Sequence, residues 1–198
     1  MSNTAIIKID IKDKSTPMIR RLESLMVGKN EIHKAIAGEE YLLFRNHLEQ
    51  AEPTRHNTAQ RLGAAPTGHL QRAADSVESS HDASNATISI TSPGIRRAFG
   101  PVEIRPVRRR ALTIPSHAAS YGKRVSDLAN DGWKIFRLKG MDVLAGRREG
   151  DENPTVLFWL RAKTVLQHDP GLLPSNDQIA DAAMAAIEKL LRRKIKKS

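Results

Sequence analysis

Seven histidines are the side chains of this sequence that could ligate a metal ion or act as a general base. Their spacing argues against both roles, because they form no HxH or HExxH pattern and the chain has no cysteine. Ser116 and His117 are neighbours, but a nucleophile and its base are paired by geometry, and no GxSxG motif is present. No GxGxxG or GxxxxGK[ST] phosphate-binding loop occurs either. We therefore expect no enzymatic activity, no bound metal and no cofactor.

Clustered arginines are the most specific feature of the chain. Residues 96–124 hold eight basic side chains and one carboxylate, Glu103. The planar guanidinium group donates two parallel hydrogen bonds, which suits phosphate or carboxylate. We predict a basic β-arm over about 95–124 whose contacts with DNA or a protein partner use Arg96, Arg97, Arg105, Arg108, Arg109, Arg110, Lys123 and Arg124. A solvated hairpin tip whose charge serves solubility is an equally supported alternative.

A second basic block closes the sequence. The segment 189–198 carries six basic residues and forms a predicted basic tail that includes Arg192, Arg193, Lys194, Lys196 and Lys197. These side chains could bind anions. Basic residues in the last turn of a helix also offset its negative end, and we favour this second interpretation.

Four aromatic residues could line a ligand pocket or a subunit interface: Trp133, Phe136, Phe158 and Trp159. Aromatic residues make up only 4% of the chain, so we expect these four to anchor the core or a subunit interface, and we favour the core.

The apolar periodicity predicts the elements that must position these residues. Alternating isoleucines indicate a strand over 6–11, and caps with helical spacing indicate helices over 16–28 and from Asn30 to Pro53. The other expected elements are a short helix over 67–79, polar turns over 80–86, strands over 87–91, 102–107, 111–114, 133–138, 142–145 and 155–165, and a helix after 175. This order predicts an α+β fold: an N-terminal strand and helices, a mainly antiparallel sheet with the basic β-arm, and a C-terminal helix.

The length of 198 residues predicts a single domain over 1–198. Residues 52–67 are poor in large apolar side chains, which is typical of a flexible loop. No stretch has the roughly 20 apolar residues of a membrane span, and 1–14 lacks the apolar run of a signal peptide, so we expect a soluble protein without membrane contact.

The charge balance indicates anionic partners. The chain has 32 basic and 22 acidic residues and a net charge of +10, and the two basic blocks hold more than the whole surplus. No aromatic residues interleave the arginines and no reading helix or zinc finger is present, so any nucleic-acid binding is expected to be nonspecific.

Several segments, taken in order, form a series of short motifs. Residues 66–73 (PTGHLQRA) are similar to a "tG.L..s" turn that leads into a short helix. Residues 100–106, 111–115 and 119–124 are similar to a "G..I.P....aL.iP......G" stretch. Phe158 to Leu160 and the segment 169–174 are similar to a final strand and a proline turn before a closing helix. In this order the segments resemble the virion-morphogenesis and tail-completion proteins of tailed bacteriophages.

This resemblance implies a structural α+β protein of the neck or of the head-proximal end of the tail, without catalytic activity. It also implies a homo-oligomeric ring around the DNA channel that joins head to tail, with connector or tail-tube proteins as neighbours and possible nonspecific contact with genomic DNA. The location would be the virion, and the host cytoplasm during assembly. The alternative is a nonspecific nucleic-acid-binding protein that acts through its arginine and lysine clusters.

Overall fold

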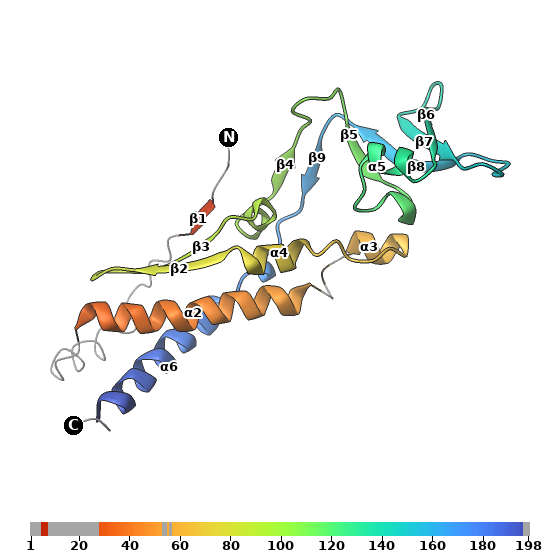
Figure 1. Cartoon of the computed structure of the whole chain (residues 1–198). Helices are drawn as coiled ribbons and strands as arrows, with labels where there is room; N and C mark the ends of the chain where they lie inside the picture. The colour runs from red at the N-terminus through yellow and green to blue at the C-terminus, as the bar shows by residue number, and fades with distance from the viewer. Residues whose placement is uncertain (1–4, 8–27, 53–54, 56, 196–198) are drawn as a thin grey trace. The chain divides into compact units, whose positions relative to one another are not determined.

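The computed structural model describes residues 5–7, 28–52, 55 and 57–195 and has the predicted α+β fold (Figure 1). The chain divides into two compact units. Unit 1 contains the described residues of 1–52, 68–99 and 169–198, and unit 2 contains those of 53–67 and 100–168. The sequence predicted one domain. No linker between the units can be recognised in the sequence, because each unit combines separate segments of the chain.

A three-stranded antiparallel sheet forms one layer of unit 1. Its strands, in spatial order, are β1 (Ala5–Ile7), β3 (Ala86–Ile90) and β2 (Val77–His81). Ile88 and Ile90 are buried and alternate with Thr87 and Ser89, so the predicted strand over 87–91 is confirmed. The predicted strand over 6–11 is described only as far as Ile7, and the predicted helix over 16–28 lies outside the described residues.

The predicted helix over 67–79 and the predicted polar turns over 80–86 are both present but shorter than expected, because strand β2 takes up Val77–His81. Helix α4 (His69–Asp75) ends early, and β2 follows it with only Val77 buried. Its other residues have no apolar alternation, so the strand depends on pairing with β3 along its whole length. The turn between the strands is closed by Asp82, whose Oδ1 accepts hydrogen bonds from the backbone amides of Ser84 (2.6 Å) and Asn85 (2.8 Å). These bonds hold the pKa of Asp82 below its usual value.

Two long helices complete unit 1. Figure 1 shows α2 (Lys29–Ala51) between strands β2 and β3 and helix α6 (Asn176–Ile195). Buried residues follow one another at every fourth position of α2, which is the spacing of one helix face: Ile32, Ile36, Glu40, Phe44 and Leu48. Helix α6 meets α2 through Ala183, Ala186 and Ile187, and the small alanines let the helices approach closely.

Helix α4 begins at a point fixed by two residues outside it. Gly68 has a φ of +67°, a conformation that favours glycine, and it turns the chain into the helix. The carboxylate of Glu52 then accepts hydrogen bonds from the amides of Leu70 (2.7 Å) and Gln71 (3.0 Å). A carboxylate at this position satisfies free amides of the first turn. The cap therefore comes from the residue after α2.

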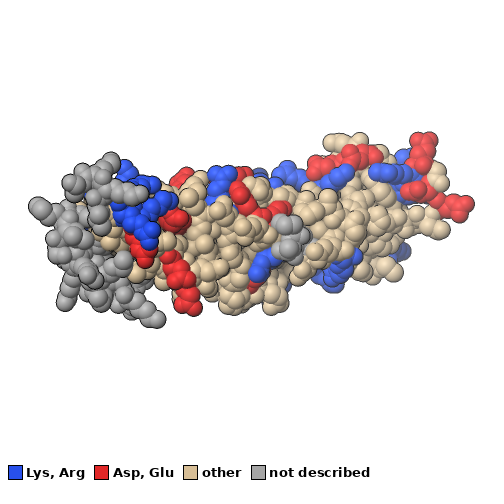
Figure 2. Space-filling model, turned by 90° about the horizontal axis from the view of Figure 1, so that it is seen from below, with Lys and Arg blue, Asp and Glu red and all other residues tan. Residues whose placement is uncertain are grey.

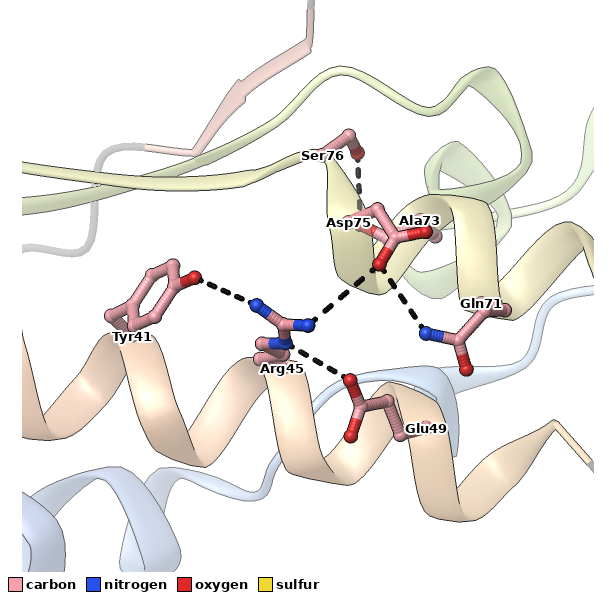
Figure 3. Close-up of polar contacts among 7 residues, drawn as sticks. All are labelled: Tyr41, Arg45, Glu49, Gln71, Ala73, Asp75 and Ser76. Carbon is pink, nitrogen blue, oxygen red and sulfur yellow. Dashed lines mark hydrogen bonds and ion pairs between the residues drawn. The ribbon is translucent and has the colours of Figure 1, made fainter.

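Arg45 ties α2 to the end of α4 (Figure 3). Its guanidinium group donates to Glu49 Oε1 (2.9 Å) and to the Tyr41 hydroxyl (3.1 Å), and it lies 3.9 Å from Asp75 Oδ1. Gln71 donates to the same Asp75 oxygen at 3.3 Å. The hydrogen bonds to Glu49 and Tyr41 hold the pKa of Arg45 above its usual value. This arginine serves the packing of the unit.

Unit 2 is built on antiparallel strands. Its four-stranded sheet has the spatial order β5 (Leu112–Pro115), β8 (Thr155–Arg161), β7 (Val143–Arg147) and β6 (Lys134–Arg137), and a separate pair joins β4 (Val102–Ile104) to β9 (Thr164–Leu166). The predicted single strand over 155–165 is thus two strands. Helix α5 (Val125–Asn130) contributes Leu128 to a core with Trp133, Leu157 and Phe158. Helix α3 (Asn57–Leu62) forms within the predicted loop over 52–67.

Gly122 allows a close contact inside unit 2. Its φ is +72°, and a Cβ atom there would lie 2.8 Å from Thr67 Cγ2. Gly132 has a similar φ of +85° but no atom within 4 Å of that position. We expect Gly122→Ala to lower the free energy of unfolding by more than the roughly 1 kcal/mol that the backbone conformation alone costs Gly132→Ala. Urea unfolding of both variants measures the difference, and equal losses would show that the Thr67 contact is unimportant.

No helix among the described residues combines the length and the apolar character that crossing a membrane requires.

Candidate functional site

The predicted basic arm does not form a hairpin, because β4 and β5 do not pair with each other. Strands β4 and β5 pair with β9 and β8, so residues 105–111 connect two separate strand pairs. We call Arg105–Arg110 the arginine loop. Arg105 Nε lies 2.6 Å from Glu103 Oε1, and Lys163 Nζ lies 3.1 Å from Glu103 Oε2. These two bonds hold the pKa of Glu103 below its usual value, the bond from Arg105 having the larger effect.

Three arginines of the arginine loop remain available to a partner. Arg108, Arg109 and Arg110 are exposed, and none of them forms an ion pair with any described residue. Val107 beside them is 95% exposed. The loop therefore presents three guanidinium groups and one apolar side chain to solvent.

The other residues of the predicted arm do not join this loop in one unit. Arg96 and Arg97 belong to a 3₁₀ helix of unit 1, Pro93–Ala98, where Arg97 lies 3.7 Å from Asp169. In unit 2, Lys123 Nζ is 2.6 Å from Asp131 Oδ2, and the backbone amide of Arg124 donates to Asp127 at 2.8 Å. The prediction of a single continuous basic arm over 95–124 is therefore wrong, because its residues are divided between the two units.

The basic tail is largely engaged within unit 1. Lys194 Nζ lies 2.8 Å from Glu31 Oε2, Lys189 Nζ lies 3.7 Å from Glu39 Oε2, and Arg192 lies 3.8 Å from Glu188 Oε2. Figure 2 shows basic and acidic side chains side by side in the part of unit 1 where α2 begins and α6 ends. Arg193 is exposed, and Lys196 and Lys197 lie outside the described residues. The tail attaches α6 to α2, which leaves less of its charge for an external anion.

The four aromatic residues separate into two pairs. Trp133 and Phe158 are 8% and 1% exposed and belong to the core of unit 2, as expected. Phe136 and Trp159 are 39% and 46% exposed, so placing these two in the core was wrong. Phe158 and Trp159 are consecutive in β8, and consecutive residues of a strand point to opposite faces of the sheet. This adjacency is the signal that could have identified the second face.

The second face of the four-stranded sheet is apolar. Trp159 is the cross-strand partner of Ile114 and Val143, and Ala145 is the partner of Phe136 and Val156. Cross-strand partners share a face of the sheet. We call this surface the aromatic face, and it comprises Ile114, Phe136, Val143, Ala145, Val156 and Trp159.

A β-bulge at Leu157 makes the two faces distinct. The register between β7 and β8 shifts at Leu144 and Ala145, so Leu157 is the extra residue of β8. Leu157 and its neighbour Phe158 are both buried in the same core, opposite the aromatic face. The large rings of Phe136 and Trp159 are exposed, whereas their smaller partners Val143 and Ala145 are buried.

The side chains that first drew attention as possible catalytic groups have structural partners. Ser116 Oγ donates to the backbone carbonyl of Val156 at 2.9 Å, and His117 Nδ1 accepts from the amide of Ala119 at 3.2 Å. His47 Nε2 lies 3.0 Å from the Gly171 carbonyl oxygen. Within the described residues, no group of three or more histidine, aspartate or glutamate side chains has the arrangement of a metal site.

The structure thus offers two candidate binding surfaces in unit 2, the arginine loop and the aromatic face. Comparison of the chain with protein-family models, with curated proteins and with solved structures finds no match.

Proposed function

We propose that this chain is a structural protein of tailed-bacteriophage assembly, which completes the tail or neck and joins head to tail as a subunit of an oligomeric ring. Its action is binding, without catalysis. The observation that carries the proposal is the arginine loop, where three exposed arginines have no ion-pair partner among the described residues. A ring repeats each loop around its axis, so a modest charge per subunit becomes a strongly basic belt.

The sequence resemblance to tail-completion proteins supports the same proposal. Two glycines of the segments that carry it, Gly68 and Gly122, have positive φ values of 67° and 72°. A positive φ is strained for residues that carry a Cβ atom, so both positions favour glycine, as the turn pattern does. The proposed neighbours are a connector or tail-tube protein, with nonspecific contact to genomic DNA in the channel.

We expect the triple variant Arg108→Ala, Arg109→Ala, Arg110→Ala to fold normally and to impair head–tail joining. Loss of several charge-assisted contacts costs a few kcal/mol of binding, so the yield of infectious particles should fall roughly tenfold or more. The measurement is complementation of a phage or prophage that lacks this gene, with electron microscopy to count unjoined heads and tails.

Arg105→Ala is the matched control for the triple variant. Arg105 belongs to the same loop but is already paired with Glu103, so its removal should change the particle yield little. Normal particle yields from the triple variant would contradict the assigned role of the loop.

The second candidate function is nonspecific nucleic-acid binding, which the same three arginines and the net charge of +10 favour. Ionic strength separates the two functions. Binding to phosphates weakens steeply as salt rises, whereas a ring interface that buries apolar surface persists. Light scattering at low and high salt, with and without random duplex DNA, distinguishes a salt-resistant ring from a salt-sensitive DNA complex.

A further inference from the structure

The aromatic face of unit 2 is an apolar surface with basic ends. At one end Arg161 lies over the Trp159 ring, 5.9 Å from its centroid. At the other end Lys134 and Arg147 are direct cross-strand partners. By register all three share the face with Phe136 and Trp159. The surface therefore has apolar rings between two groups of positive charge.

The strands of the sheet supply no counter-charge for these three cations on the aromatic face. None of Lys134, Arg147 and Arg161 forms an ion pair with a described residue, and no strand residue on this face is a carboxylate. Asp142, which precedes β7, pairs with Arg137 on the opposite face at 2.7 Å. Like charges placed opposite each other on a sheet repel, so an incoming carboxylate between Lys134 and Arg147 would remove a repulsion as well as form new bonds.

We infer that the aromatic face binds a protein segment that carries apolar side chains flanked by carboxylates. The apolar side chains would cover Phe136 and Trp159, and the carboxylates would pair with Arg161 at one end and with Lys134 and Arg147 at the other. This inference deepens the proposed function, on which it rests, by giving the chemistry of the protein partner.

Two other occupants fit the surface less well. A second copy that docked face to face would bring Lys134, Arg147 and Arg161 against the same three cations, which opposes a two-fold dimer through this face. A nucleic-acid duplex would satisfy the cations, but its bases are stacked inside the duplex, so most of the apolar strip between the cations would stay unburied. A protein segment with both apolar side chains and carboxylates would cover the aromatic rings and pair with the cations.

Binding of labelled peptides to the full-length protein tests the inference. The probe is a 12-residue peptide that repeats the pattern Glu-Glu-Leu-Phe-Asp-Leu, and fluorescence anisotropy reports its binding. We expect a Kd on the order of 10–100 μM, which suits a small interface. Two comparison peptides replace the acidic residues by lysine or the apolar residues by alanine, and each should bind at least about tenfold more weakly.

Variants of the protein locate the bound peptide. Trp159→Ser and Arg161→Glu should each weaken binding of the acidic apolar peptide by about tenfold or more. Arg124→Glu makes the same charge change next to α5, which packs on the opposite face of the sheet, and should leave the Kd within about twofold. Far-ultraviolet circular dichroism and the urea midpoint establish that the variants are folded.

Each other outcome would overturn the inference. Equal Kd values for the acidic and basic peptides would show that charge does not contribute to binding. An unchanged Kd for Trp159→Ser would show that the peptide does not bind at the aromatic face. Displacement of the peptide by single-stranded or duplex DNA would assign the surface to nucleic acid. Self-association that Trp159→Ser abolishes would assign it to a second copy. The particle-assembly test of the arginine loop is independent, so these results and a failure of the proposed function remain distinguishable.

Discussion

Replacing Glu40 by leucine is expected to raise the free energy of unfolding of unit 1 by about 2–3 kcal/mol at pH 8. Glu40 lies on the buried stripe of α2 between Ile36 and Phe44 and is 0% exposed. Neither carboxyl oxygen has a hydrogen-bond partner among the residues that the structure describes. Burial raises the pKa of this carboxyl from 4.5 to about 7.

The raised pKa fixes the direction of the pH dependence. Between pH 4.5 and about pH 7 the unfolded chain releases the Glu40 proton while the folded protein retains it. The contribution of Glu40 to stability therefore falls as pH rises through this window, by about 1.4 kcal/mol for each unit of pKa difference, and then becomes constant. Leucine cannot ionise, so Glu40→Leu removes this slope and also the cost of a buried, unbonded polar group.

Urea unfolding at pH 5, 6, 7 and 8 measures the effect, with Glu39→Leu as the control. Glu39 is the neighbouring carboxylate, it is partly exposed, and it lies 3.7 Å from Lys189. Its replacement should leave the pH slope of the wild type in place. A Glu40→Leu variant with the wild-type slope would show that the carboxylate is solvated or paired in solution.

Phe158→Ala is expected to lower the stability of unit 2 by about 3–5 kcal/mol, the usual cost of emptying a buried phenylalanine site. Phe158 is 1% exposed and packs with Leu128, Trp133 and Leu157. Helix α5 and the sheet enclose this core, so the cavity has little freedom to collapse. Hydrogen exchange of the β8 amides, together with urea unfolding, measures the loss.

Phe136→Ala is the matched control for Phe158→Ala. It makes the same substitution in the same sheet, but on the aromatic face, where Phe136 is 39% exposed. We expect a smaller loss, of about 1–2 kcal/mol, because more than a third of this residue's surface stays in water in the folded protein. Equal losses for the two variants would mean that the aromatic face is covered in the free protein.

The sequence predicts individual helices and strands better than it predicts which elements pair with one another. The alternation of apolar residues in β3 and their helical spacing in α2 and α6 are strong signals, because the buried face of each element recurs at a regular interval within one short segment. Strand β2 has no such pattern and exists through its pairing with β3. Glu40 was detectable, since it lies four residues from both Ile36 and Phe44, yet a carboxylate is ordinarily expected to be exposed.

The sequence predicts which residue types form the candidate site, but it does not predict which of these residues the fold brings together. Arg97, Lys123 and Lys194 appear equivalent to Arg108 in the sequence, but each has a carboxylate partner: Asp169, Asp131 and Glu31 respectively. Two of these partners are distant in sequence, so no local pattern reveals them. The adjacency of Phe158 and Trp159 in one strand indicates opposite faces, but only the strand register shows which residues of the neighbouring strands share the face with Trp159.

The interleaving of the two units has a consequence for synthesis on the ribosome. Every residue of unit 2 lies before Asp169, whereas the core of unit 1 joins Ile36 of α2 to Ile187 of α6. The part of the α2 stripe at Ile32 and Ile36 must therefore wait for α6, while unit 2 can already fold. A nascent chain halted before Asn176 would expose this stripe and become a substrate for chaperones, so full-length translation acts as the checkpoint for completing unit 1.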